Sequence, residues 1–138
     1  MPDTREPRPP FRHAVRVYWE DTDAGGIVFY ANYLRYFERA RTEWLRALGV
    51  EQQALRTETG LIFVVSQANV RYLRPAVLDD SLEITVALAE AGRASMTLQQ
   101  QAWRGSELLA DGEVRIGCID VQTMRPQRIP KTLYDRIA

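Results

Sequence analysis

The segment from residue 20 to residue 30 brings together the groups that acyl transfer to water requires. It contains three acidic side chains, those of Glu20, Asp21 and Asp23, then a glycine pair at 25 and 26, and it leads into a long amphipathic helix. A carboxylate can act as a nucleophile or as a general base for water. The first N–H groups of a helix lack helical acceptors and lie at the positive end of its dipole, so they can stabilise an oxyanion. The segment therefore favours hydrolysis of an activated acyl group.

The helix that must position these groups is expected over residues 32–48. Its apolar residues recur at helical spacing and form one face. They are Tyr33, Phe37, Ala40, Trp44 and Leu48. Asn32 is the expected N-cap and Gly49 the expected stop. We expect the aromatic residues of this face to belong to the core and not to a cofactor site.

Alternation of apolar and polar residues predicts one strand before the acidic segment and four after the helix. The expected strands cover residues 12–20, 61–71, 82–88, 96–102 and 108–121, with short helical segments at 51–57 and 133–137. One helix has to cover the apolar face of the sheet. The sequence thus predicts an α+β fold in which an antiparallel sheet of about five strands wraps around one long central helix.

Length and composition limit the possible classes of protein. The 138 residues predict a single domain at 11–138, preceded by a flexible, proline-rich arm at 1–10. Eighteen acidic and eighteen basic residues give no net charge, which argues against nucleic acid as a partner. No apolar run approaches the ~20 residues of a membrane span, and no secretory signal is apparent. The lone Cys118 excludes an internal disulfide and fits a reducing compartment, so we expect a cytoplasmic protein.

One cysteine and one histidine, His13, argue against a zinc site, and we expect neither metal nor cofactor. A Ser-His-Asp triad would have to use His13, which lies in the first expected strand. Hydratase or dehydratase chemistry, which pairs histidine with a carboxylate, is disfavoured for the same reason.

The chain resembles the hotdog-fold 4-hydroxybenzoyl-CoA thioesterase family, and especially its YbgC-like branch of acyl-CoA thioesterases associated with the Tol–Pal system. The likeness runs from about residue 15 to residue 130. It rests on residues 18–29, the Ala31-Asn32-Tyr33 run, residues 36–43 and 75–84, Cys118-Ile119-Asp120 and Met124-Arg125-Pro126. The first block is specific, and the later ones support it.

The resemblance implies that Asp23 is the catalytic carboxylate and that the backbone N–H of Tyr30 contributes to an oxyanion hole. Many YbgC-like proteins have histidine at the position of Tyr30, so a mechanism that needs that imidazole does not transfer, whereas one that uses the backbone N–H does. Gly26 allows close approach of the backbone to the substrate. Phe29 lines the acyl pocket or belongs to the core, and Arg93 matches a phosphate-contacting position of the family.

Alternatives remain at several positions. Asp21 is the rival carboxylate, and Glu20 is interpreted as a surface charge. Arg71 and Arg74 are further candidates for contacting the phosphates of coenzyme A.

The implied protein is a homodimer or homotetramer that hydrolyses acyl-CoA. A thioesterase acting on acyl carrier protein and a non-catalytic acyl-binding or scaffold protein of the cell envelope remain alternatives. The sequence does not select an acyl chain length or an aromatic acyl group.

Overall fold

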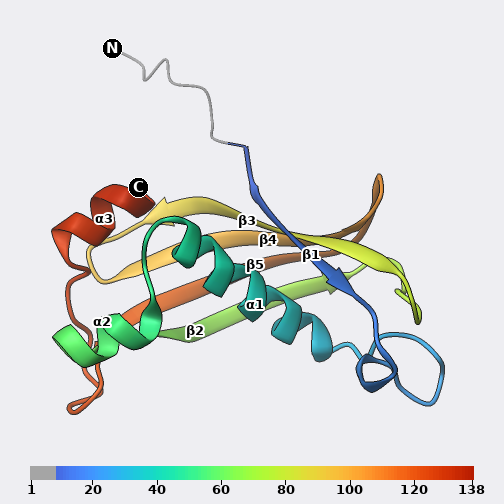
Figure 1. The fold of residues 1–138 in the computed structure, drawn as a ribbon, viewed down its shortest axis with the longest axis horizontal. Coiled ribbons are helices and arrows are strands. Elements are labelled where there is room, and N and C mark those ends of the chain that lie inside the picture. Colours follow the sequence, from blue (N-terminus) through green and yellow to red (C-terminus); the bar gives the residue numbers. More distant parts are fainter. Residues whose placement is uncertain (1–8) are drawn as a thin grey trace.

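Five antiparallel strands and one long helix make up most of the computed structural model, which describes residues 9–138 (Figure 1). The strands are β1 (Phe11–Arg16), β2 (Leu61–Tyr72), β3 (Ser81–Ala91), β4 (Ser95–Arg104) and β5 (Glu107–Asp120). Their order in the sheet is β1-β3-β4-β5-β2, so β1 and β2 form the two edges. The helices are α1 (Asn32–Ala47), α2 (Gln52–Thr59) and α3 (Lys131–Ile137), with a 3₁₀ turn, η1, at Trp19–Asp21. The predicted α+β architecture is confirmed.

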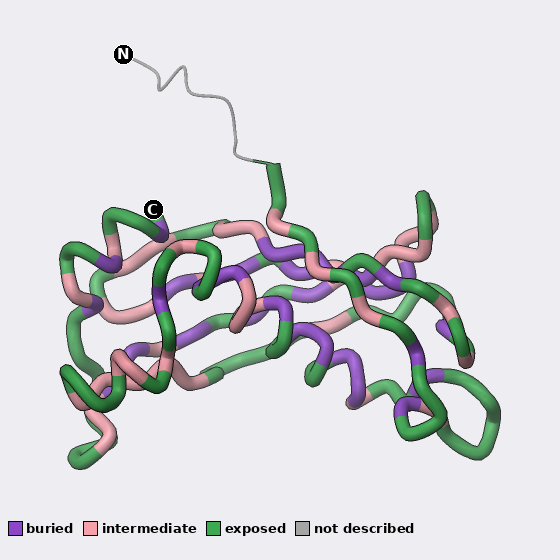
Figure 2. The backbone as a smooth tube through the Cα atoms, in the orientation of Figure 1, coloured by how far each residue is buried: buried purple, intermediate pink, exposed green. Residues whose placement is uncertain are grey.

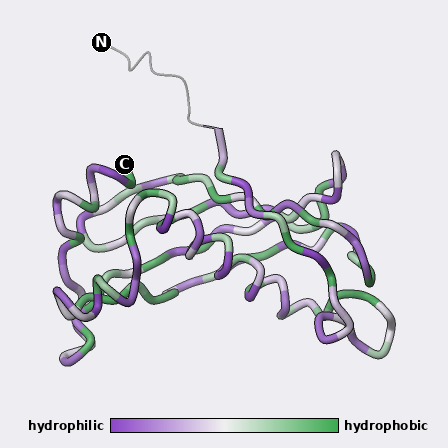
Figure 3. Tube along the Cα trace, viewed as in Figure 1, coloured by the Kyte–Doolittle hydropathy of each residue, from purple (hydrophilic) through white to green (hydrophobic). Residues whose placement is uncertain are grey.

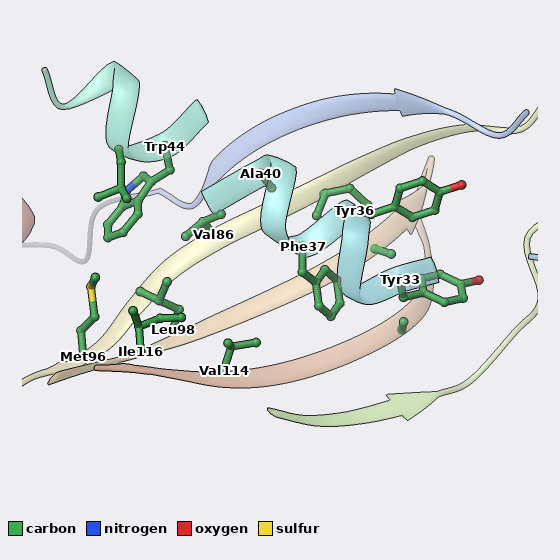
Figure 4. Close-up of a cluster of buried hydrophobic side chains, with 14 of the residues drawn as sticks. Tyr33, Tyr36, Phe37, Ala40, Trp44, Val86, Met96, Leu98, Val114 and Ile116 are labelled. Atoms are coloured by element: carbon green, nitrogen blue, oxygen red, sulfur yellow. The ribbon is translucent and has the colours of Figure 1, made fainter. Parts of the chain in front are cut away.

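Helix α1 lies across one face of the sheet and buries the face predicted from its periodicity (Figures 1 and 4). Tyr33, Phe37 and Trp44 are all buried against the sheet, so the aromatic residues of the helix belong to the core. The helix ends at Ala47, one residue before the predicted end, with Leu48 as its C-cap, and the predicted stop, Gly49, follows with a φ of 84°. There the N–H of Val50 donates to the carbonyl of Leu45 at 2.8 Å and closes the last turn.

The core fills the space between α1 and the middle of the strands (Figure 2). Hydrophobic and hydrophilic stretches interleave along the strands, as the alternation predicts (Figure 3). The Phe37 ring of α1 packs tightly against Gly112 of β5, where an added Cβ would lie 2.8 Å from Cε2 of Phe37. A residue without a side chain is therefore needed under this turn of the helix.

Two predictions near the start of the chain are wrong. The first strand ends at Arg16 and not at residue 20, because Val17 exchanges backbone hydrogen bonds of 2.9 and 3.0 Å with Asp80 and Asp79, and the next residues turn into η1. Asn32 is not the N-cap of α1: Ala31 occupies that position, and no side chain caps the helix there. The side chain of Asn32 bonds to Asp21 instead.

Most other boundaries differ from the predicted ones by one or two residues, the usual fraying of element ends, and β3 continues three residues beyond the predicted end at residue 88. The predicted arm at 1–10 lies outside the described residues except for Pro9 and Pro10, which are exposed. Within residues 9–138, no helix is both long enough and apolar enough to cross a membrane.

Candidate active site

The loop between η1 and α1 carries most of the predicted site residues and is folded on itself. Thr22 and Val28 form an isolated antiparallel bridge, and the N–H of Asp23 donates to the carbonyl of Ile27 at 2.9 Å. The N–H of Gly26 returns to the carbonyl of Asp23 at 3.0 Å, which closes a tight turn. Gly26 has a φ of 79°, a conformation that favours glycine, so the loop needs this residue for its shape.

Asp23 is exposed at the tip of this loop. Its Oδ1 accepts a hydrogen bond of 2.8 Å from the N–H of Gly25, and no described residue donates to its Oδ2. One carboxylate oxygen is thus fixed by the loop, while the other remains available to a ligand or water.

Asp21 has the opposite environment, although it lies only two residues away. It is 5% exposed. Its Oδ2 accepts from the N–H of Tyr18 at 2.8 Å and its Oδ1 accepts from Nδ2 of Asn32 at 2.9 Å, while its backbone carbonyl accepts from the N–H of Phe29 at 2.9 Å. Asp21 therefore ties η1, the loop and the first residue of α1 together.

The Tyr36 side chain lies beside this buried pair. Burial, and then the neighbouring Asp21 carboxylate, raise the pKa of the Tyr36 hydroxyl, so the phenol stays protonated. Asp21 is surrounded by groups that fix its position and is closed to solvent, which makes it a structural carboxylate.

The start of α1 presents free backbone donors, as predicted. The carbonyls of Phe29 and Tyr30 accept the N–H groups of Asn32 and Tyr33 at 2.8 and 3.3 Å. The N–H groups of Tyr30 and Ala31 donate to no residue that the structure describes. These two amides lie at the positive end of the helix dipole and can bind an anion.

Aromatic rings surround these donors. The Tyr30 ring is 63% exposed and lies 4.9 Å from the Phe29 ring and 6.0 Å from the Tyr72 ring, between ring centroids. Phe29 is 46% exposed, which excludes the core alternative for this residue, and its role in an acyl pocket stays a prediction. Tyr72 ends β2, which means that the start of α1 lies at that end of the strand.

A second set of contacts holds the loop from the β2–β3 connection. The N–H of Val28 donates to the carbonyl of Ala76 at 2.9 Å, and the next residue, Val77, donates to Oδ2 of Asp80 at 2.9 Å. Arg104 donates to the same oxygen at 2.8 Å. Burial alone would raise the pKa of Asp80, but the Val77 N–H and the Arg104 guanidinium lower it below its usual value. The Asp80 carboxylate is therefore charged near neutral pH.

Arg93 lies in the β3–β4 turn beside α3, at the opposite end of the molecule from the Asp23 loop (Figure 1). It lines a pocket of about 290 Å³ together with Arg128, Lys131 and Tyr134. The N–H of Ile129 donates to the carbonyl of Arg93 at 2.8 Å and brings the two basic segments together. Sequence reasoning missed Arg128 and Lys131, because they lie far from Arg93 in the chain and only the fold brings them beside it.

The remaining predicted residues are placed as follows. Glu20 is exposed on η1, as expected of a surface charge. Arg74 pairs with Glu107 at 3.0 Å, which leaves it less available to a phosphate, and Arg71 is exposed on β2. His13 lies in β1 opposite Ile84. Among the described residues, no cluster of histidine, cysteine and acidic side chains has the arrangement of a metal site.

Comparisons with known proteins identify the family and the fold. The sequence profile of the thioesterase-like superfamily matches residues 17–137. The acyl-CoA thioesterase YbgC of Haemophilus influenzae is 43% identical over 121 residues, which cover 88% of this chain and 89% of that protein. The acyl-CoA thioester hydrolase YbgC of Escherichia coli O6:H1 is 44% identical over 124 residues, or 89% and 92% of the two chains. The crystal structure of a probable thioesterase from Bartonella henselae superposes with a TM-score of 0.85 at 32% identity, over 88% of this chain and 100% of that one.

Proposed function

Because the chain belongs to the thioesterase-like superfamily of hotdog-fold thioester hydrolases, we propose that it hydrolyses acyl-CoA to a carboxylic acid and coenzyme A. The observation that carries this proposal is the loop before α1, which presents an accessible carboxylate and two free backbone donors within nine residues. We further propose that residues 11–138 form one thioesterase domain. Its lone, buried Cys118 fits a protein of the reducing cytoplasm.

In this mechanism Asp23 acts on the thioester carbonyl through its free oxygen. As a general base it takes a proton from water while the water oxygen attacks the carbonyl carbon, and the C–S bond then breaks to release the thiolate of coenzyme A. As a nucleophile it forms an anhydride with loss of the same thiolate, and water then hydrolyses the anhydride. Both routes give the same products, and general-base assistance is typically worth about 10²–10⁴ in rate.

The negative charge that develops on the carbonyl oxygen is stabilised by the N–H of Tyr30, with that of Ala31 beside it. A donor of this kind is worth about 10²–10³ in turnover. The Tyr30 side chain points its ring at Phe29 and Tyr72, so this role belongs to its backbone and does not require the histidine found at this position in many YbgC-like proteins. The exposed Phe29 ring offers an apolar contact for the substrate next to the reacting bond.

Arg93, with Arg128 and Lys131, offers positive charge for the phosphates of coenzyme A. This group lies too far along the molecule to serve Asp23 of its own chain (Figure 1). We therefore propose that two copies pair antiparallel along β2, an edge strand exposed from Val65 to Asn69. Such pairing reverses one copy relative to the other and brings the Arg93 end of one to the Asp23 end of its partner. A homotetramer would contain two such pairs.

The proposal is tested by measuring release of free thiol from a panel of acyl-CoA esters by the purified protein. Asp23→Asn should lower kcat by about 10²–10⁴, because the amide is neither a base nor a nucleophile. Asp79→Asn, a change at an exposed aspartate outside the loop, is the matched control and should keep wild-type rates.

Two outcomes would contradict this function. Full turnover by Asp23→Asn would remove Asp23 from the mechanism. If wild-type protein does not cleave any acyl-CoA, the acyl-CoA hydrolase proposal fails; cleavage of acylated acyl carrier protein by the same sample would then identify the alternative substrate, and binding without cleavage would favour a scaffold.

A further inference from the structure

A second pocket lies under α1, away from both the Asp23 loop and the Arg93 pocket. It has a volume of about 270 Å³ and opens between α1, α2 and β2. Its floor is made by the buried side chains of Met96, Leu98 and Ile116, with Trp44 beside them (Figure 4). Phe63 also lines it, and Glu38, Arg41, Thr42 and Gln52 add polar groups to the lining. The apolar floor suits a hydrocarbon group, and the polar side chains offer partners for a polar end.

Its size restricts the group that can enter. A cavity of about 150 Å³ holds benzene. A space of about 270 Å³ therefore has room for a short chain or one ring, and a long fatty acyl chain would have to extend out of its open mouth.

The pocket also contains one half-buried cation. Arg41 donates from Nη1 to Oε1 of Gln100 at 3.1 Å, and the fully buried Gln100 in turn donates to the carbonyl of Phe37 at 3.0 Å. Among the described residues Arg41 has no salt-bridge partner. Burial lowers the pKa of its guanidinium, and the Glu38 carboxylate nearby raises it, but an arginine remains charged in proteins.

Glu38 is close enough to stabilise this cation, but the two side chains form no salt bridge. It lies on the exposed rim of the pocket, where its Oε1 accepts from the Thr42 hydroxyl at 3.0 Å. Among the described residues the guanidinium makes one hydrogen bond, to Gln100, so its other N–H groups are available to a ligand or to water. Glu38, Thr42 and Gln52 are its polar neighbours in the lining.

We propose that this pocket receives the acyl group and that Arg41 selects short acyl groups whose far end carries a carboxylate. The methylene groups would pack on the apolar walls, and the terminal carboxylate would take charge-assisted hydrogen bonds from Arg41. A site built around a charged donor discriminates strongly against an analogue that lacks the acceptor, because the donor is then left buried without a partner.

This inference rests on the proposed function, since it assumes that the bound acyl group meets a catalytic loop. The start of α1 contacts Tyr72 at one end of β2, whereas the pocket lies by Phe63, toward the other end. Antiparallel pairing of two β2 strands would therefore place the catalytic loop of one copy beside the pocket of the other.

The test compares glutaryl-CoA with pentanoyl-CoA, two esters of equal chain length that differ in the terminal carboxylate. Wild-type protein should cleave glutaryl-CoA with a kcat/KM about tenfold or more above that of pentanoyl-CoA, and palmitoyl-CoA should be a poor substrate. Arg41→Met keeps the apolar stem without the charge and should lower kcat/KM for glutaryl-CoA by about 10- to 100-fold while leaving pentanoyl-CoA nearly unchanged.

Two further variants distinguish a loss of substrate recognition from a loss of folding. Arg41→Lys keeps the positive charge and should retain part of the preference for glutaryl-CoA. Arg35→Met, an exposed position on the same helix, should leave both rates unchanged. Thermal unfolding checks that each variant is folded.

Some results would overturn the inference. An equal loss for both esters in Arg41→Met would reduce Arg41 to a structural role, and a wild-type preference for palmitoyl-CoA would show that this pocket is not the acyl site. If wild-type protein cleaves no ester, the proposed function fails separately. In that case, the binding of glutaryl-CoA and pentanoyl-CoA is measured by calorimetry. Equal affinity for the two esters would reject the role of Arg41, whereas a preference for glutaryl-CoA that is lost in Arg41→Met would support it.

Discussion

Asp21 and Asp23 carry the same functional group, but their different surroundings suit them to different roles. Asp21 is buried and accepts from two donors, the Tyr18 N–H and the Asn32 amide, whereas Asp23 is exposed and keeps one oxygen free. A carboxylate whose lone pairs are occupied by fixed donors can position a loop but cannot take up a proton from water.

This division predicts opposite outcomes for two truncations. Asp21→Ala leaves the buried Asn32 amide and the part-buried Tyr18 N–H without their acceptor and should lower the free energy of unfolding by about 2–4 kcal/mol. Asp23→Ala removes an exposed side chain and should change the free energy of unfolding by less than about 0.5 kcal/mol while lowering kcat by about 10²–10⁴. Urea unfolding measured beside thiol release separates the two effects. A stable Asp21→Ala protein and an unstable Asp23→Ala protein would reverse the assignment.

The sequence could not separate these two residues by itself. Both precede the helix and both are short acids in a turn-forming segment, so spacing alone leaves them as rivals. Burial distinguishes them, and it depends on the side chain of Asn32, which was expected to cap the helix and instead reaches back to Asp21. The preference of asparagine for the N-cap position is weak, and the buried Asp21 carboxylate is a stronger partner for the Asn32 side-chain amide.

At the scale of elements, the strand alternation and the helical face were predictable because both express burial on one side of a regular structure. The long-range contacts were not. A backbone hydrogen bond from Ile129 to Arg93 joins two segments that lie far apart in the sequence, and no local pattern predicts this contact. The hydrogen bond holds Arg128 beside Arg93. The end of β1 was also missed, because the residues after Arg16 keep an alternating pattern while their hydrogen bonds go to the β2–β3 connection.

The packing of α1 on the sheet depends on a glycine in β5. Gly112→Ala would place its Cβ 2.8 Å from the Phe37 ring and 3.2 Å from the carbonyl of Gln100. The ring or the helix has to shift, and we expect a loss of about 1–3 kcal/mol in the free energy of unfolding. Gly117→Ala in the same strand is the control, since the nearest atom lies 4.0 Å away, and it should be nearly neutral. Urea denaturation measures both, and equal stability of the two variants would contradict this account of the contact.

At the scale of the whole molecule, the proposed site is divided between the two ends of one chain. The Asp23 loop lies at the end of the sheet where β2 finishes, and the cationic pocket lies by α3 at the other end (Figure 1). A substrate with an anionic nucleotide and a reactive thioester would reach both only if a second copy supplied one of them. The proposed antiparallel pairing along the exposed β2 edge would provide that arrangement, with two equivalent sites related by a two-fold axis.

A complementation experiment tests whether Asp23 and the arginines of one site come from two different copies. Asp23→Asn lacks the carboxylate, and the double variant Arg93→Met with Arg128→Met lacks phosphate-binding charge, so each should be nearly inactive at low substrate concentration. When the two are unfolded together and refolded, a mixed dimer holds one site with Asp23 from one copy and the arginines from the other. Random mixing makes about half of the dimers mixed, with one intact site in each, so about a quarter of wild-type kcat/KM should return.

The recovery is measured by kinetics on the refolded mixture, with each variant refolded alone as the control. Mixed dimers without recovered activity would mean that both groups act within one chain, which the distance between the two ends of the sheet argues against.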